Sequence, residues 1–254
     1  MQPSHQGTTR FSNRVADYVR SRPRYPDGLL DILRSDAGLT TNTVIADIGS
    51  GTGFSAEPFL KNGNIVYGVE PNSEMRSAAE TLLAAYPNFH SVNGTAEATT
   101  LPDRSIDLIV AGQAFHWFDP PKAREEFRRI LRENATVVLF WNTIQERLTP
   151  FMRAYSNLLH QFGTDFKEVV HTNVDRAQLQ SFYGGDFVKH TLPNEQRFDR
   201  EGLRSRMLSN SYTPPVGHPN YEPMLAELDR VFEENQEEGE VRMVYGTEVY
   251  LGTL

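Results

Sequence analysis

Three glycines at alternate positions follow a short apolar run in VIADIGSGTGF, residues 44–54. Gly49, Gly51 and Gly53 form a GxGxG pattern, and Asp47 stands two residues before the first of them. Glycine permits a tight turn that a Cβ would obstruct, and it lets the backbone approach a ligand closely before a helix begins. The segment therefore predicts a strand that ends in a loop around a nucleotide-like ligand.

A second acid belongs to the same predicted site. Glu70 ends the next apolar run, in GVEPN, about 20 residues beyond the glycines. Because neighbouring parallel strands end at one crevice, a carboxylate there can accept hydrogen bonds from both ribose hydroxyls of an adenosine. Two alternatives need no ligand contact. Glu70 would be a charge near the helix start at Asn72, and Asp47 would only brace the loop by accepting backbone N–H bonds.

The glycine spacing distinguishes this loop from two other nucleotide motifs. The dinucleotide fingerprint GxGxxG would place its third glycine at position 54, where the sequence has Phe54. A phosphate-binding P-loop requires a Lys followed by Ser or Thr after the glycines, and none follows here. An NAD-dependent oxidoreductase is therefore a less favoured alternative function.

The surrounding pattern alternates between strand and helix. Apolar runs typical of buried strands are 43–48, 65–70, 89–93, 106–111 and 136–141, and helical patterns lie between them at 55–62, 73–86 and 122–132. This alternation predicts an α/β protein with a parallel sheet and helices on both faces. Beyond residue 142 we expect helices at 150–162, 175–183, 201–209 and 221–235, and strands at 187–192 and 241–252.

Composition limits the classes of partner. The chain has 254 residues, 39% of them hydrophobic, which predicts a single domain over 1–254 with insertions. A net charge of −8 disfavours binding to nucleic acid. The absence of cysteine removes thiolate chemistry and disulfides, and no metal-ligand spacing is present. Without a signal-peptide pattern or an apolar run of about 20 residues, we expect a cytoplasmic protein that does not bind membranes.

Four blocks in order, DIGSGTG, VEPN, GTAEATTLPDRSIDLIVAGQAFHWFD and VVLFWN, resemble the class I S-adenosylmethionine-dependent methyltransferases. The likeness is to the small-molecule branch of methyltransferase type 11, akin to trans-aconitate methyltransferases, and it spans about residues 10–142. It implies a Rossmann-like seven-stranded sheet whose last two strands are antiparallel, with helices on both faces and an added helical lid. It also implies S-adenosylmethionine as the cofactor. Many members of the family have cysteine where this chain has Ser50.

The resemblance also implies a set of cofactor-binding residues. The glycine loop would surround the methionine half of the cofactor, Glu70 would bind the ribose, and the segments after the second, third and fourth strands would contact the adenosine and the sulfonium. The residues are Asp47, Gly49, Ser50, Gly51, Gly53, Glu70, Pro71, Asn72, Met75, Thr95, Ala96, Glu97, Gln113 and Ala114.

Methyl transfer from a sulfonium is an in-line displacement with a good leaving group. The protein chiefly has to hold the acceptor within about 3 to 3.5 Å of the methyl carbon and exclude water. A base is required only for a protonated acceptor, and His116 in AFHWF is the candidate for that role or for orienting the acceptor. The alternative is that His116 only hydrogen-bonds the cofactor or backbone. Trp117 and Phe118 are expected to form a pocket wall rather than a core contact.

The N-terminal segment FSNRVADYVRSRPRYP carries aromatic residues and arginines at helical spacing. It could simply pack on the sheet as an amphipathic helix. The resemblance implies instead a lid helix within 1–28 that places Tyr18, Arg22 and Tyr25 near the methionine carboxylate or the acceptor. Arginine suits a carboxylate because it can bind it in a bidentate pair. The segments 143–184 and 200–220 are expected to complete the acceptor pocket.

The expected function is methylation of a small molecule at oxygen or nitrogen, with a carboxylate favoured. One alternative is a protein that binds S-adenosylmethionine without catalysis. A second is an amino-methyltransferase, whose (Asn/Asp)-Pro-Pro-aromatic motif resembles Asp119–Pro121. That motif comes too late after the fourth strand and is followed by Lys122, so we interpret it as a helix cap. The sequence leaves the oligomeric state open.

Overall fold

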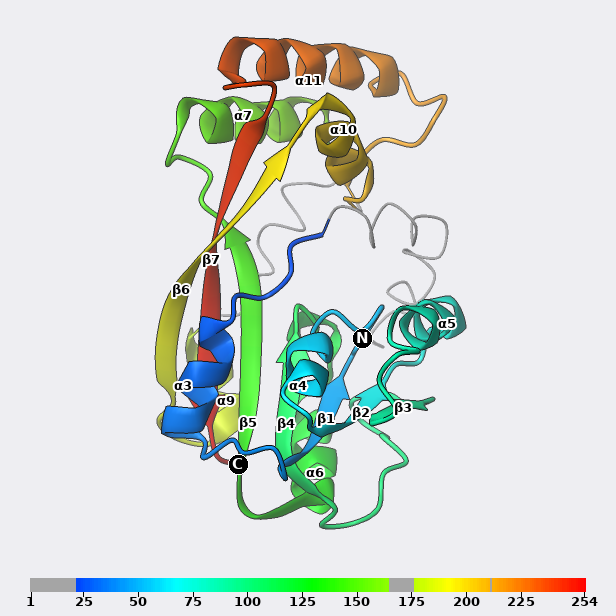
Figure 1. Ribbon diagram of the computed structural model, residues 1–254, viewed down its shortest axis with the longest axis vertical. Helices are drawn as coiled ribbons and strands as arrows, with labels where there is room; N and C mark the ends of the chain where they lie inside the picture. The colour runs from blue at the N-terminus through cyan, green and yellow to red at the C-terminus, as the bar shows by residue number, and fades with distance from the viewer. Residues whose placement is uncertain (1–21, 165–175, 211) are drawn as a thin grey trace.

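The computed structural model describes residues 22–164, 176–210 and 212–254. Within these residues, seven strands form one sheet in the order β3-β2-β1-β4-β5-β7-β6 (Figure 1). Their bounds are β1 Val44–Ile48, β2 Ile65–Val69, β3 Phe89–Val92, β4 Ile106–Gly112, β5 Leu131–Ile144, β6 Val188–Phe198 and β7 Val241–Gly252. Strands β1 to β5 are parallel, and β7 pairs antiparallel with both β5 and β6. The expected α/β sheet with two final antiparallel strands is confirmed.

Helices cover both faces of this sheet, as predicted. They are α3 Gly28–Asp36, α4 Glu57–Lys61, α5 Ser73–Leu82, α6 Pro120–Ile130, α7 Pro150–Phe162, α9 Arg176–Tyr183, α10 Arg200–Leu208 and α11 Tyr221–Asn235, with a short 3-10 helix η2 at Phe115–Trp117. Successive residues of β4 point to opposite faces: Leu108 and Val110 pack with α3 and α4, whereas Ile109 and Ala111 pack with α6 and α9. The sheet is therefore buried on both sides.

Two helices that carry site residues start at side-chain caps. The Asn72 carboxamide oxygen accepts hydrogen bonds from the backbone N–H groups of Glu74 and Met75 at the start of α5. Asp119 accepts from the N–H of Lys122 at the start of α6, with Pro120 in the first turn. Both caps satisfy backbone donors that a helix start leaves unpaired. The Asp119–Pro121 motif is thus a helix cap.

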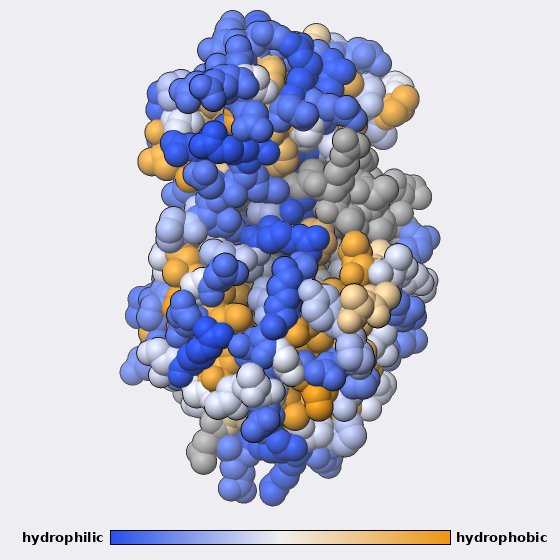
Figure 2. All heavy atoms as spheres, in the orientation of Figure 1, coloured by the Kyte–Doolittle hydropathy of each residue, from blue (hydrophilic) through white to orange (hydrophobic). Residues whose placement is uncertain are grey.

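Besides the two hydrophobic clusters on the faces of the sheet, a third hydrophobic core lies apart from the sheet. Helices α7, α10 and α11 pack around the far ends of β6 and β7, and we call this unit the cap; its buried side chains include Tyr155, Leu159, Met207, Leu228, Phe232, Met243 and Tyr245. Figure 1 shows the cap at the top, beyond the upper end of β5. Figure 2 shows its outer face as mainly hydrophilic, which agrees with ion pairs such as Arg230 with Glu227 and Glu234.

The predicted insertion at 143–184 and the predicted N-terminal lid helix are each described in part by the structure. The segment 143–184 is divided, because α7 joins the cap whereas α9 packs against the sheet through Leu179, Phe182 and Tyr183. Residues 22–27, the described end of the predicted lid helix, form neither helix nor strand, and the rest of that prediction lies outside the described residues. Within the described ranges, no helix combines the length and apolar character that a membrane span requires.

Candidate functional site

The glycine loop leaves β1 with all three glycines in the left-handed region, at φ values of +70° for Gly49, +54° for Gly51 and +87° for Gly53. A Cβ on Gly49 would lie 2.6 Å from the Cβ of Ala114, and one on Gly53 would lie 2.5 Å from Leu83 Cδ1. At these two positions only glycine fits. A Cβ on Gly51 would instead meet no heavy atom of the described residues within 4 Å, so among these residues open space lies over the middle of the loop.

Asp47 is fully buried at the end of β1. Its Oδ2 accepts a 2.6 Å hydrogen bond from the Ser55 hydroxyl, while its Oδ1 has no hydrogen-bond partner in the described structure. Burial raises the pKa of this carboxyl to about 7, against the opposing effect of the Ser55 hydrogen bond. The Thr52 hydroxyl is also buried without a partner. Buried polar atoms normally have partners, so these two atoms indicate a site for a polar ligand.

Glu70 connects the glycine loop to the start of α5. Its Oε2 accepts from the N–H of Gly51 at 3.0 Å, and its Oε1 accepts from the N–H of Asn72 at 2.9 Å. Burial raises the pKa of Glu70, and the two backbone hydrogen bonds oppose that rise. Each carboxylate oxygen can accept a second hydrogen bond, so these contacts leave capacity for two hydroxyl donors.

The neighbouring residues of the predicted set flank this carboxylate. Pro71 is exposed, and its carbonyl accepts from Arg76 Nη1. Ser50 and Met75 are buried, the latter directly below the Asn72 cap. All of them follow the carboxyl ends of β1 and β2, which pair in parallel, and the structure therefore brings them to one edge of the sheet.

The segment after β3 forms a tight turn. Thr95 and Ala98 exchange backbone hydrogen bonds of 3.1 and 3.3 Å, with Ala96 buried inside the turn. The Oε1 atom of Glu97 accepts a hydrogen bond from the N–H of Asp119, at the start of α6, at 2.8 Å. This turn also belongs to the carboxyl edge of the sheet, because β3 runs parallel to β2.

The segment that follows β4 carries Gln113, predicted to contact the cofactor, and then the predicted acceptor-side residues His116 and Trp117. Gln113 has a φ of +57° and donates from Nε2 to the carbonyl of Asn142 at 3.2 Å. Within η2, His116 is half-buried and its ring centroid lies 4.8 Å from that of Trp117. Burial lowers the pKa of His116 to about 4, so the imidazole is neutral at pH 7. His116 makes no hydrogen bond to any described residue.

The aromatic residues around His116 divide between surface and core. Trp117 is 45% exposed, which suits a pocket wall. Phe118 instead packs edge-on against Phe115 and Phe127 at centroid distances of 5.8 and 6.2 Å. Phe118 is therefore a core contact rather than the wall residue predicted, and the wall role of Trp117 stays a prediction.

Residues 22–27, which we call the strap, run between the sheet and the cap. Arg22 donates from Nη2 to the carbonyl of Ser209 in the cap at 2.9 Å. Tyr25 packs edge-on against Phe140 of β5 at 4.6 Å. Tyr18, the third residue predicted for this segment, lies outside the described residues. The strap thus joins the two parts of the structure that the predicted acceptor site requires.

Residues that sequence reasoning missed hold the strap in place. Asn142 donates to the carbonyl of Pro23 at 3.4 Å, and Asn194 donates to the carbonyl of Arg24 at 2.8 Å. Asn194 and Thr247 both donate to Asn142 Oδ1, at 3.0 and 2.6 Å. The only sequence signal was Asn142 at the end of VVLFWN, because its partners are far away in the chain.

Arg24 and Phe54 form a second missed contact. The guanidinium carbon of Arg24 lies 3.6 Å from the centroid of the Phe54 ring, and Arg24 also pairs with Glu57 at 2.5 Å. Phe54 therefore occupies the third-glycine position of the dinucleotide motif as a binding surface for the strap.

Comparison with known proteins agrees with this geometry. The family described as a methyltransferase domain matches residues 46–139. An uncharacterized methyltransferase of Mycobacterium tuberculosis is 34% identical over 175 residues, which are 67% of this chain and 69% of that protein. An uncharacterized methyltransferase-like protein of Schizosaccharomyces pombe is 29% identical over 87% of this chain and 85% of its own length.

Solved structures show the same fold at lower identity. A candidate type II methyltransferase from Anaeromyxobacter dehalogenans has a TM-score of 0.63 at 19% identity, over 91% of this chain and 97% of that one. Phosphoethanolamine N-methyltransferase 2 of Haemonchus contortus, in complex with phosphomonomethylethanolamine and S-adenosylhomocysteine, has a TM-score of 0.56 at 13% identity, over 98% of this chain and 59% of that one.

The sheet order, the glycine loop and these relatives define a class I methyltransferase, and the chain belongs to that family. It is an S-adenosylmethionine-dependent enzyme, as the sequence resemblance predicted, and not a nicotinamide oxidoreductase. The names of the Mycobacterium tuberculosis and Schizosaccharomyces pombe relatives specify no acceptor, so the likeness to the trans-aconitate branch stays a prediction.

Proposed function

We propose that this methyltransferase methylates a small molecule at oxygen or nitrogen, and that a carboxylate is the favoured acceptor. When bound, S-adenosylmethionine supplies a methyl group on a sulfonium, which is already activated for transfer. The chain's own tasks are to hold the cofactor, orient the acceptor and exclude water.

The residues present fit the cofactor. The unpartnered Oδ1 of Asp47 suits a cationic amino group, the free acceptor capacity of Glu70 suits the ribose hydroxyls, and the space over Gly51 leaves room for the ligand. We propose that the carboxyl edge of β1 to β4 holds the cofactor through the predicted set apart from Arg22, which is treated below: Asp47, Gly49, Ser50, Gly51, Gly53, Glu70, Pro71, Asn72, Met75, Thr95, Ala96, Glu97, Gln113 and Ala114.

The observation that favours an anionic acceptor is a buried cation in the cap. Arg206 of α10 is 2% exposed, and all its described hydrogen-bond partners are neutral: Tyr245 Oη at 3.3 Å, Ser209 Oγ at 3.4 Å and Asn210 Oδ1 at 2.6 Å. Among the described residues, no acidic side chain forms an ion pair with Arg206 and none accepts a hydrogen bond from Nη2. Because a buried charge without a counter-ion is costly, a bound carboxylate would stabilise this guanidinium.

The strap brings a second guanidinium to the same place. Arg22 donates to the carbonyl of Ser209, the residue whose hydroxyl Arg206 contacts. We therefore assign Arg22 to the acceptor side rather than to the methionine carboxylate predicted as one of its two partners. Tyr25, His116 and Trp117 would complete the wall, with His116 as orienting group. A carboxylate oxygen attacks the methyl carbon without losing a proton, so this acceptor needs no base.

The test is a screen of small acids, alcohols and amines for transfer of a labelled methyl group. A methyl ester is recognised because alkali releases its label as volatile methanol. We expect di- and tricarboxylic acids to be methylated, and Arg206→Gln to raise the acceptor KM while the Kd for S-adenosylhomocysteine stays unchanged. Transfer to amines or alcohols only, with Arg206→Gln as active as the wild type, would refute the carboxylate preference.

A further inference from the structure

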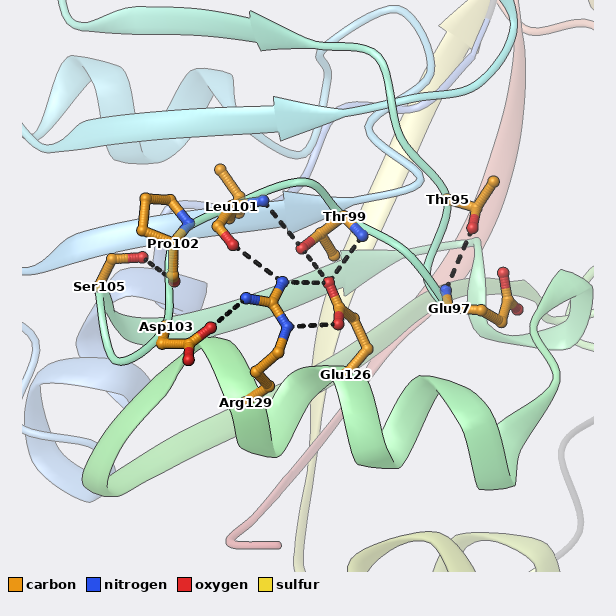
Figure 3. A network of polar contacts seen from close by, with 9 residues as sticks. All are labelled: Thr95, Glu97, Thr99, Leu101, Pro102, Asp103, Ser105, Glu126 and Arg129. Carbon is orange, nitrogen blue, oxygen red and sulfur yellow. Dashed lines mark hydrogen bonds and ion pairs between the residues drawn. The ribbon is translucent and has the colours of Figure 1, made fainter.

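Two charged residues of α6, Glu126 and Arg129, bind the loop between β3 and β4 through hydrogen bonds and an ion pair (Figure 3). Glu126 Oε1 accepts from the N–H of Thr99 at 2.8 Å, from the Thr99 hydroxyl at 2.5 Å and from Arg129 Nη2 at 2.7 Å. The Glu126 side chain is only 10% exposed, and Thr99 is fully buried. The two contacts between Glu126 and Thr99 are therefore shielded from water, and hydrogen bonds to a charged group are strong in such surroundings.

Arg129 binds further residues of the same loop. It donates from Nε to Glu126 Oε2 at 2.8 Å, from Nη2 to the carbonyl of Leu101 at 2.8 Å and from Nη1 to Asp103 at 2.5 Å. Hydrogen bonds from Arg129 and Thr99 lower the pKa of Glu126 to about 2. We call Glu126 and Arg129 together the clamp.

The loop between the clamped residues is strained. Thr100 has a φ of +65°, a conformation that is a genuine outlier for a β-branched residue. Such strain persists only where the surroundings hold the backbone in place. Thr100 lies between Thr99 and Leu101, and the clamp binds both of them. The clamp is thus the feature that holds this backbone conformation.

What the clamp holds is the Thr95–Ala98 turn. A Cβ on Gly94 would lie 2.7 Å from the carbonyl oxygen of Thr99, so the start of the turn packs directly on the clamped residue. At the other side, Glu97 accepts from the N–H of Asp119 at the start of α6. The turn is attached to α6 at two separate points, and Figure 3 shows both Glu97 and Thr99 on this loop above the helix.

We propose that Glu126 and Arg129 are positioning residues that fix the Thr95–Ala98 turn against the adenine of the cofactor and so determine selectivity for that base. Neither residue touches the cofactor. The inference rests on the proposed function, in which Thr95, Ala96 and Glu97 lie at the adenine edge. A turn held at two points presents its backbone groups in one geometry, and selective hydrogen bonding to a base requires that.

The experiment measures binding of two ligands to the full chain by calorimetry: S-adenosylhomocysteine and its deaminated analogue S-inosylhomocysteine, which has an oxo group in place of the adenine amine. We expect Glu126→Gln to raise the Kd for S-adenosylhomocysteine on the order of tenfold, the effect of losing about one hydrogen bond between the displaced turn and the adenine. The Kd for S-inosylhomocysteine should rise much less, so that the ratio of the Kd for the analogue to the Kd for S-adenosylhomocysteine falls.

The matched control is Glu227→Gln. Glu227 binds Arg230 through both oxygens at the same i,i+3 spacing, on α11 in the cap. It should change neither Kd. If Glu126→Gln does not fold, Thr99→Val removes the hydroxyl contact while keeping the branched shape. The same fall in the ratio of the two Kd values is then expected. An equal loss of affinity for both ligands, or no loss in a folded variant, would overturn the positioning role.

A third variant separates the clamp from the site assignment. Ala96→Val enlarges a buried residue of the turn itself. If it changes the selectivity ratio but Glu126→Gln does not, the clamp proposal fails alone. If the wild type does not discriminate between the two ligands and Ala96→Val has no effect, the proposed adenine placement is wrong, and the clamp proposal fails with it.

Discussion

Gly51→Ala tests whether the open space over the glycine loop is ligand space. Gly51 has a φ of +54°, and a Cβ there would meet no atom of the described part of the chain within 4 Å. Gly38, after α3, is its matched control, because its φ is +63° and its Cβ would also meet nothing. Alanine in the left-handed region costs about 1–2 kcal/mol. Both variants should lose that much free energy of unfolding in urea titrations without ligand.

Only Gly51→Ala should weaken cofactor binding. A methyl group that occupies ligand space acts as overpacking, which costs about 1–3 kcal/mol. This converts to a roughly 5-fold to 150-fold rise in the Kd for S-adenosylhomocysteine, measured by calorimetry. Gly38→Ala should bind like the wild type. Equal affinities for the two variants would refute the inference that the cofactor lies over Gly51, whatever their stabilities.

Three further substitutions have distinct expected outcomes. The pKa of Asp47 is about 7 in the folded state and 3.8 when unperturbed. The stability that its protonated form contributes is therefore complete below about pH 4 and is lost as the pH rises through 7. In urea titrations between pH 5 and 8, Asp47→Asn should have a higher free energy of unfolding than the wild type. His116→Ala should lower kcat less than tenfold for a carboxylate acceptor, since a loss of about 10² to 10⁴ would indicate an acceptor that needs a base. Asn142→Ala removes the contact to the Pro23 carbonyl and should cost about 1–3 kcal/mol in unfolding free energy while raising the acceptor KM in steady-state assays.

The sheet was predictable because its signals are local. The parallel strands β1, β2 and β4 are short apolar runs, and the cap at Asp119 was found from residue type and position. The predicted ends of a strand were less accurate where pairing with a distant strand determines them. The expected strand 136–141 is β5, Leu131–Ile144, and its final residues Thr143 and Ile144 are in the sheet because they pair with β7. Helix α3 was missed although Leu29 and Leu33, both buried, have helical spacing.

The two halves of the site differ in how the sequence encodes them. The residues of the proposed cofactor side lie in short contiguous motifs, because the glycine loop and the acidic residues at the strand ends supply most of its geometry. The proposed acceptor side depends on pairs that are distant in the chain: Arg22 contacts Ser209 across 187 residues, and Thr247 contacts Asn142 across 105. The cap that supplies Arg206 has a core of its own. Its residues can therefore change without disturbing the glycine loop, and acceptor identity has to be sought in the cap and strap rather than in the motifs that define the family.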